Sequence, residues 1–205
     1  MLILLLIIPI MGCLLLLPIE ENSVSSQEKM KKIALSASFL NLILSLIIWF
    51  LFNSNINDYQ FVYEFNQLSF FHFNLGIDGT SLYFVLLTTF ITPLSLLSNW
   101  TDIKIKLKYF LISFLILETL QIGVFVVLDL FLFYIFFESV LIPLFIIILT
   151  WGASESKIRA AFLIFLYTFF GSLFMLLAIV IIYYHIGSTD YELISLSEIS
   201  IENQY

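Results

Sequence analysis

The stretch of sequence that decides the fold is D-L-F-L-F-Y-I-F-F-E-S-V-L-I-P, residues 129–143. It belongs to an apolar run long enough to cross a membrane, yet it carries a carboxyl group, Glu138, in its middle. Glu138 follows Asp129 by nine residues, which is about 13 Å of helix rise. If Asp129 marks one face of the membrane, Glu138 lies near the middle of a hydrocarbon core about 30 Å thick.

A carboxylic acid at this depth is costly. Insertion of an acid at the centre of a membrane helix costs about 2.5–3.5 kcal/mol, and such acids commonly line ion or proton pathways. The alternative is a protonated Glu138 that only hydrogen-bonds to a neighbouring helix. Pro143 removes the hydrogen bond to the carbonyl group of Ser139, so we expect a bend beside the acid. The stretch predicts a proton-handling site inside a transmembrane helix.

The composition places the whole chain in the membrane class. Hydrophobic residues make up 61% of the chain and charged residues only 11%, which excludes an ordinary soluble domain. The net charge is −7, and without a basic face the chain is not expected to bind nucleic acid. A single cysteine, Cys13, and two histidines cannot hold a haem or an iron–sulfur cluster. We therefore expect no cofactor in this chain.

Apolar runs on both sides of the central stretch predict further spans. The run from 109 to 151 is too long for one crossing at about 20 residues per helix, and Asp129 divides it. The block 1–18 lacks a positively charged start and a cleavage site, so we expect a retained first helix. We predict an all-α integral membrane protein, a single membrane domain over 1–205, with six helices at about 1–18, 33–52, 79–99, 109–128, 130–151 and 160–184.

The segment between the second and third spans has a different pattern. Aromatic residues alternate with other residues from Tyr59 to Phe65, which is a strand signal. The run F-F-H-F-N-L, residues 70–75, is a candidate return strand. We predict a short β-hairpin in an outer loop at the membrane interface. His72 falls in it and is interpreted as an ordinary interfacial histidine.

Basic residues are fully segregated. All eight lie between spans one and two, three and four, or five and six, whereas 53–78 and the tail after His185 have none. The positive-inside rule predicts that both termini and the hairpin lie on the outer side. A stripe of Asn41, Ser45 and Trp49 on the second span is expected to face protein and to carry no chemistry.

A second acid lies at a similar depth. Glu118 follows Lys108 by ten residues, about 15 Å from the inner face, with Gln121 at i+3 on the same side of the helix. Whether Glu118 and Glu138 face each other stays open. The spans hold no Lys, Arg or His except His185 at an edge, and a carboxyl group buried without a cation favours its neutral form. Any partner cation is expected from outside these residues.

Three segments, 75–93, 116–143 and 157–179, resemble the chain 4 family of mitochondrial NADH:ubiquinone oxidoreductase, respiratory complex I. They include L-G-I-D-G-T-S (75–81) and F-F-E-S-V-L-I-P (136–143). The resemblance implies an antiporter-like, proton-translocating subunit of the membrane arm. Glu138 matches the family's essential buried glutamate on the fifth helix, and Glu118 a secondary acid on the fourth.

The same resemblance implies the surroundings of the chain. It implies the mitochondrial inner membrane, other membrane-arm subunits as partners, and NADH, FMN, iron–sulfur clusters and ubiquinone bound by other subunits. Family members are longer, and a C-terminal half or separate chain would supply their buried lysines. Two alternatives stay open: a sodium/proton antiporter subunit, and a structural membrane subunit or fragment without transport.

Overall fold

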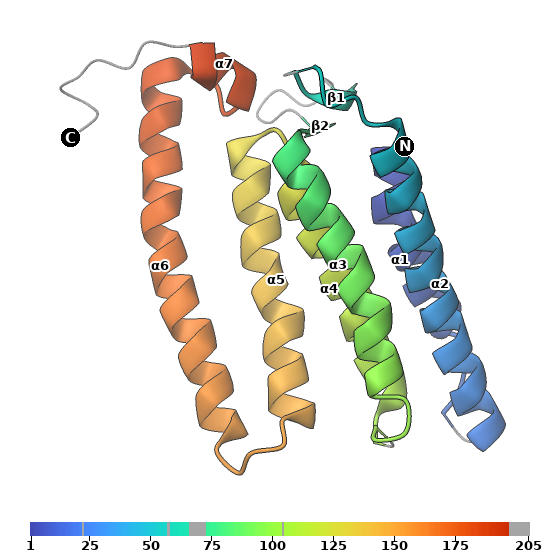
Figure 1. Ribbon diagram of the computed structural model, residues 1–205. Helices are drawn as coiled ribbons and strands as arrows, with labels where there is room; N and C mark the ends of the chain where they lie inside the picture. Colours follow the sequence, from blue (N-terminus) through green and yellow to red (C-terminus); the bar gives the residue numbers. More distant parts are fainter. Residues whose placement is uncertain (22, 57, 66–72, 104, 197–205) are drawn as a thin grey trace.

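The computed structural model describes residues 1–205 except 22, 57, 66–72, 104 and 197–205. Within these residues the chain is mostly helical, with a small sheet and a short helix at one end (Figure 1). The elements in order are α1 Leu2–Leu16, α2 Val24–Leu51, β1 Gln60–Phe65, β2 Phe73–Ile77, α3 Gly79–Ser98, α4 Leu107–Val126, α5 Leu130–Trp151, α6 Lys157–Ile186 and α7 Tyr191–Leu196. The predicted all-α membrane architecture, with a short β-hairpin between the second and third predicted spans, is confirmed.

Helix lengths differ from the prediction at the N-terminal end. Among the described helices, α2 to α6 are the five that are long and apolar enough to cross a membrane. The 15 residues of α1 rise only about 22 Å. Helix α2 begins at Val24, not at 33, because Ser23 and Ser26 form a capping box in which each hydroxyl accepts the other's backbone N–H at 3.2 Å. Residues 24–32, which lie between the first two predicted helices, are therefore helical.

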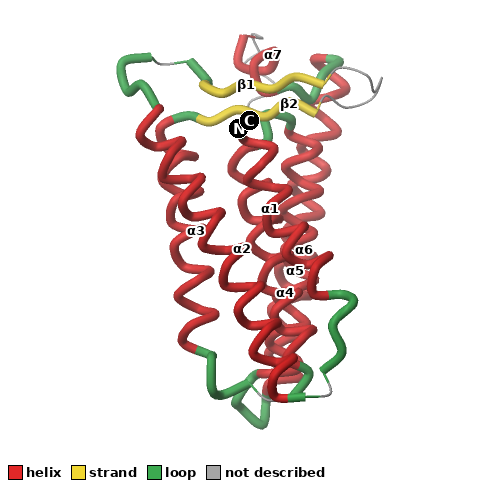
Figure 2. Tube along the Cα trace, turned by 90° about the vertical axis from the view of Figure 1, so that its right-hand side faces the viewer, coloured by secondary structure: helices red, strands yellow, loops and turns green. Residues whose placement is uncertain are grey.

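The predicted hairpin is present. Strands β1 and β2 pair antiparallel, with Tyr63 opposite Leu75 and an irregularity between Gln60 and Tyr63. Phe61 there has a φ of 55°, so the alternation of the sequence is interrupted near the start of β1. The hairpin lies across the same end of the bundle as α7 (Figure 2). His72 and the rest of 66–72 lie outside the described residues.

Helices α1 to α4 form the core, which has two hydrophobic clusters. One cluster, near the hairpin, joins α1, α2, β2, α3 and α4 around Leu5, Ile48 and Ile122. The other, near the opposite end, joins α1 to α4 around Leu16 and Leu115. Between them along the helices lie buried polar residues, among which Ser38, Asn41, Ser45, Thr89 and Glu118 are at most 1% exposed.

Helices α5 and α6 extend the bundle on one side. Helix α5 packs against α4, and α6 packs against α5 (Figure 1). Most of α6 is exposed and apolar, as shown by Phe162, Phe170 and Phe174, which are all half exposed or more. Such a surface suits contact with lipid or with other membrane helices.

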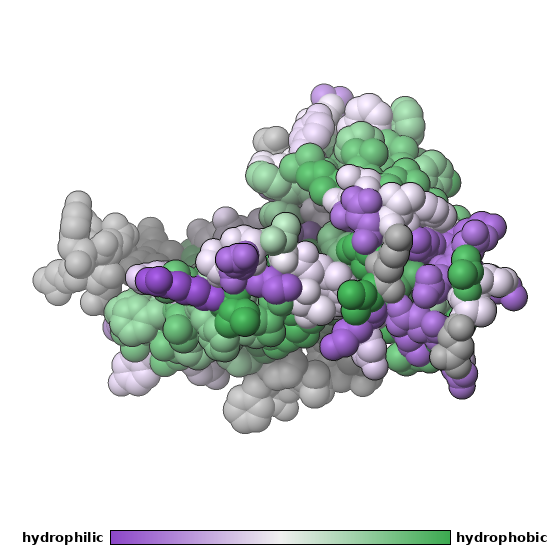
Figure 3. Space-filling view, turned by 90° about the horizontal axis from the view of Figure 1, so that it is seen from below, coloured by the Kyte–Doolittle hydropathy of each residue, from purple (hydrophilic) through white to green (hydrophobic). Residues whose placement is uncertain are grey.

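The described basic residues lie at one end of the bundle. The described Lys and Arg residues lie in the loops opposite the hairpin or in the first three turns of α2, α4 and α6. Figure 3 looks onto this end and shows hydrophilic residues gathered over it among hydrophobic ones. The segments at the hairpin end carry acidic residues such as Asp58, Glu64 and Asp190. The predicted segregation of the basic residues is thus present among the described residues.

Candidate functional site

Glu118 lies in the interior of the bundle. It is eight residues before the end of α4 at Val126, about 12 Å from that end, and only 1% of its surface is exposed. Its Oε1 accepts a hydrogen bond of 2.8 Å from Nδ2 of Asn41 on α2. The other carboxyl oxygen, Oε2, is buried without a hydrogen-bond partner. The acid is therefore held by one donor from a helix distant in sequence.

The sequence pattern placed Asn41 in a protein-facing stripe without a chemical role, and the structure places it against the acid. Asn41 is fully buried and contacts the acid directly. Ser45, one helical turn further on, shares a hydrogen bond of 2.8 Å with Thr89 on α3. Trp49, the third member of the predicted stripe, is 41% exposed. The stripe faces protein for its first two residues only, and one of them bears on the candidate chemistry.

Glu138 lies on α5, the helix that packs between α4 and α6. It follows the start of α5 at Leu130 by eight residues, again about 12 Å. The residue is half-buried, and its Oε2 is buried with no hydrogen-bond partner. Helix α5 is continuous from Leu130 to Trp151, with Pro143 inside it and buried. The side chain thus lies in the middle of a helix that the described residues cover only in part.

The two acids share a depth but not a hydrogen bond. Each lies eight residues from the short connection between α4 and α5, so the predicted equality of depth is present. Within the described part of the chain, no hydrogen bond or ion pair joins them, and Glu118 turns to α2 for its donor. Helices α4 and α5 approach each other closely at Gly123. A Cβ added there would come within 2.6 Å of the Phe136 ring.

The connection between α4 and α5 is fixed by Asp129. Its Oδ1 accepts hydrogen bonds of 2.9 Å from the backbone N–H groups of Phe131 and Leu132, and so caps α5. Its Oδ2 accepts a hydrogen bond of 2.6 Å from the Thr189 hydroxyl. Asp129 is 1% exposed, and three donors compensate its burial. The residue predicted to divide the two spans does so as a helix cap.

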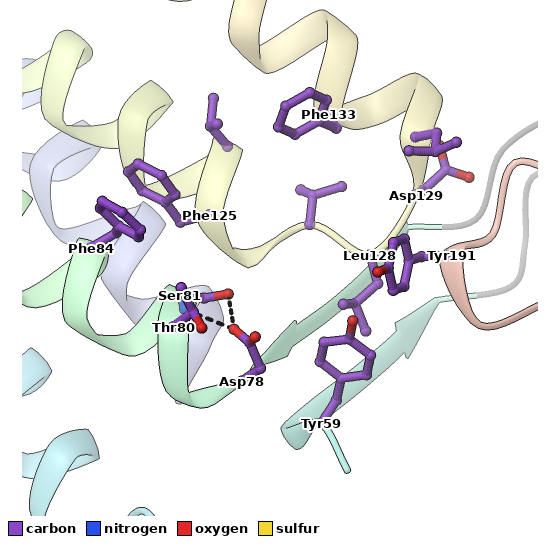
Figure 4. A pocket seen from close by; sticks show the side chains of 13 residues that line it. Tyr59, Asp78, Thr80, Ser81, Phe84, Phe125, Leu128, Asp129, Phe133 and Tyr191 are labelled. Atoms are coloured by element: carbon purple, nitrogen blue, oxygen red, sulfur yellow. Dashed lines mark hydrogen bonds between the residues drawn. The ribbon is translucent and has the colours of Figure 1, made fainter. Parts of the chain in front are cut away.

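A pocket of about 380 Å³ opens beside this connection. Tyr59 and Tyr191 lie toward one another at its edge (Figure 4), with ring centroids 6.1 Å apart. Burial, followed by the neighbouring Tyr191 and Asp78, raises the pKa of Tyr59 to about 12. Asp78 itself caps α3 by accepting hydrogen bonds from the backbone and hydroxyl of Ser81 (Figure 4). The pocket is lined by structural groups at the hairpin end of the bundle.

Three of the described lysines at the opposite end donate hydrogen bonds to backbone carbonyl groups. The Lys31 ammonium donates to the carbonyl oxygen of Trp100, and that of Lys108 donates to those of Leu17 and Ile19. Lys157 donates to the carbonyl oxygen of Thr150 at 3.0 Å. These contacts tie the loops together and lie away from both acids.

Comparison with known proteins gives concordant matches. Residues 127–204 match a family model described as "NADH:quinone oxidoreductase/Mrp antiporter, TM". The chain is 60% identical over 204 residues to NADH-ubiquinone oxidoreductase chain 4 of Mycosarcoma maydis, covering 100% of this chain and 42% of that one. It is 45% identical over 202 residues to the protein of the same name from Arabidopsis thaliana, covering 98% and 40%.

Solved structures agree on the fold. The chain matches one chain of respiratory complex I from Thermus thermophilus with bound NADH, at a TM-score of 0.79 and 26% identity. That match covers 98% of this chain and 40% of the other. The chain thus spans about two fifths of the length of the relatives it matches. On these similarities, the chain belongs to the NADH-ubiquinone oxidoreductase chain 4 family of antiporter-like membrane subunits.

Proposed function

We propose that the chain is a membrane-arm subunit of a proton-pumping NADH:ubiquinone oxidoreductase. In this proposal it contributes part of an antiporter-like proton path through Glu138 and Glu118. The observation that carries it is Oε2 of Glu138, which is buried in the middle of α5 without a hydrogen-bond partner. A membrane helix keeps such an acid at a cost of about 2.5–3.5 kcal/mol, and proton transfer is a function that requires it.

The names of the relatives and the positions of the charges in the chain support a proposal for its surroundings. We propose that the chain works in the mitochondrial inner membrane beside other membrane-arm subunits. NADH, FMN, iron–sulfur clusters and ubiquinone are bound, in this proposal, by other subunits of the complex. The described Lys and Arg residues lie near the loops. The cation that works with Glu138 is therefore proposed to be a lysine outside these 205 residues, in the remaining length of the family's proteins.

The proposed mechanism is an alternation at Glu138. When a lysine ammonium approaches, the carboxylate is the favoured form and the proton leaves. When the ammonium withdraws, burial favours the neutral acid and Glu138 takes up a proton. The change in the free energy of proton binding at Glu138 between the two states has to exceed the work of moving a charge across the membrane, about 2.3 kcal/mol per 100 mV. Glu118, which already has a donor in Asn41, serves as the auxiliary acid.

The test compares three glutamines in the assembled complex: Glu138→Gln, Glu118→Gln and, as the matched control, Glu155→Gln in the exposed loop before α6. Proton uptake per NADH oxidised is measured in sealed vesicles, and native gels report assembly. We expect Glu138→Gln to abolish most pumping, Glu118→Gln to reduce it much less, and Glu155→Gln to leave it unchanged. Small and equal losses from the first two would reduce Glu138 to a packing group in a structural subunit.

A second function is favoured by the family model, whose description also names the Mrp antiporter. In that case the chain would work with other antiporter subunits and exchange sodium for protons. Co-purification decides between the two: flavin and iron–sulfur subunits accompany a respiratory subunit, whereas membrane antiporter chains alone accompany the other.

A further inference from the structure

A second pocket lies between α3 and α4, on the flank of Glu118. Its volume is about 400 Å³, and since a water molecule takes about 30 Å³ in the liquid, it has room for several. Its polar lining comes from both helices: Thr88, Thr92, Ser95, Glu118 and Gln121. Thr88 lies in the middle of α3 and Glu118 near the middle of α4, so the pocket reaches the depth of the acid.

Glu118 and Asn41 each present a buried oxygen that lacks a donor. These atoms are Oε2 of Glu118 and Oδ1 of Asn41, while the opposite atoms of the two groups share the 2.8 Å hydrogen bond. Buried acceptors of this kind are normally satisfied by a proton donor, commonly water. A proton on Oε2, or a water molecule from the pocket, supplies the donor that this pair requires.

The hydroxyl groups of the pocket add acceptors of their own. Thr88 donates its hydroxyl proton to the carbonyl oxygen of Phe84 at 2.8 Å, and Thr92 donates to that of Thr88 at 2.9 Å. Since each hydroxyl is already used as a donor, its oxygen remains available to accept from water. The polar part of the lining is therefore suited to molecules that donate hydrogen bonds, and the rest of the lining is apolar: Phe84, Leu87, Ile91, Phe114, Leu117 and Phe125.

We propose that the α3–α4 pocket holds water in the membrane and that Glu118 exchanges its proton with that water, with Asn41 as the positioning residue. When the acid gives up its proton, the bond between Oε2 and hydrogen breaks and the proton moves to a water oxygen, which leaves a carboxylate and a hydronium ion. Return of the proton reverses the step. Throughout, Nδ2 of Asn41 holds Oε1, so Oε2 keeps its direction. The proposal rests on the proposed function, to which it adds an access route.

The test follows hydrogen–deuterium exchange of the Glu118 carboxyl group by infrared spectroscopy, with the full chain in lipid nanodiscs moved from H₂O to D₂O. The carbonyl band of the protonated acid shifts on deuteration, and its loss in Glu118→Gln assigns it. We expect Thr92→Leu and, separately, Thr88→Leu to fill the pocket and slow the exchange roughly tenfold or more, because exchange then needs a local opening of the bundle. The unfolding temperature of each variant verifies the fold.

Thr89→Val is the matched control, because Thr89 is the neighbouring residue of α3 but its hydroxyl bonds to Ser45 and lies outside the pocket. Its exchange rate should equal that of the parent chain. Unchanged exchange in both leucine variants, as expected if lipid fills the pocket, would overturn the proposal.

The outcome is separable from that of the proposed function. Normal pumping in Glu138→Gln together with slowed exchange in the leucine variants would contradict the proposed proton path through Glu138 but support the hydrated pocket. Lost pumping in Glu138→Gln with unchanged exchange in the leucine variants would support the proton path but contradict the hydrated pocket.

Discussion

The side-chain amide of Asn41 donates a hydrogen bond of 2.8 Å to Oε1 of Glu118, and so joins α2 to α4 across 77 residues of sequence. Both residues are buried between two hydrophobic clusters of the four-helix core. Hydrogen bonds between membrane helices contribute about 0.6–2 kcal/mol each. The contact therefore serves the stability of the bundle as well as the orientation of the acid.

This relationship predicts a coupled pair of substitutions. Asn41→Leu should lower the free energy of unfolding by about 1–2 kcal/mol, because it leaves the carboxyl group buried without a donor. Adding Glu118→Leu should restore most of the loss, since replacing both partners by apolar groups is close to neutral. Chemical unfolding of the four chains in detergent gives the coupling energy. Strictly additive losses would mean that the two side chains do not interact.

The approach of α4 and α5 gives a second prediction. A Cβ at Gly123 would lie 2.6 and 2.7 Å from two carbon atoms of the Phe136 ring, so Gly123→Ala should destabilise the chain by about 1–3 kcal/mol through overpacking. The control is Gly171→Ala on α6, where nothing lies within 4 Å. It should be neutral or slightly stabilising, since alanine favours helix. Phe136→Leu should relieve the first variant. Equal unfolding temperatures for both alanine variants would contradict the close approach.

Much of the fold could be predicted from the sequence because membrane helices are encoded locally. Long apolar runs, the dividing Asp129 and the distribution of basic residues define the spans, and each of these signals lies within one segment. The hairpin was predictable from period-two alternation for the same reason. The start of α2 was missed because polar residues such as Lys31 and Lys32 obscure a helix whose cap, Ser23, is a short-range hydrogen-bond motif.

The partners of the acids could not be predicted, because they depend on how helices rotate about their axes. The spacing of Asn41 and Ser45 indicates a protein-facing stripe but not which residue of α4 it meets. The hydrogen bond from Thr189 to Asp129 joins residues 60 positions apart in the sequence. It lies at the end of the bundle, where the sequence has no periodicity. A polar residue inside an apolar span was the available signal for Asn41.

A third prediction concerns pH at the hairpin end of the bundle. In the unfolded chain the Tyr59 phenol ionises near its ordinary pKa of about 10, whereas burial and Tyr191 raise the pKa to about 12 in the fold. The fold thus favours the neutral phenol, so this stabilisation is complete below about pH 10 and is lost as pH rises through about 12. Absorbance titration should show a phenolate step near pH 12 that is absent in Tyr59→Phe. The control is Tyr83→Phe, on the exposed face of α3, which should keep this step. A late step that survives Tyr59→Phe would contradict the assignment.

The last prediction is the orientation of the chain in the membrane. Because basic residues gather opposite the hairpin, the positive-inside rule places their loops in the matrix and the hairpin in the intermembrane space. Two exposed serines test it: Ser54, between α2 and β1, and Ser154, between α5 and α6. Each is changed to cysteine in a chain whose single cysteine, Cys13, buried in α1, is replaced by alanine. A membrane-impermeant maleimide applied to the outer face of the inner membrane should label Ser54→Cys at once and Ser154→Cys only after the membrane is permeabilised. Labelling of both from one side would contradict an odd number of crossings between them, and the reverse order would invert the topology.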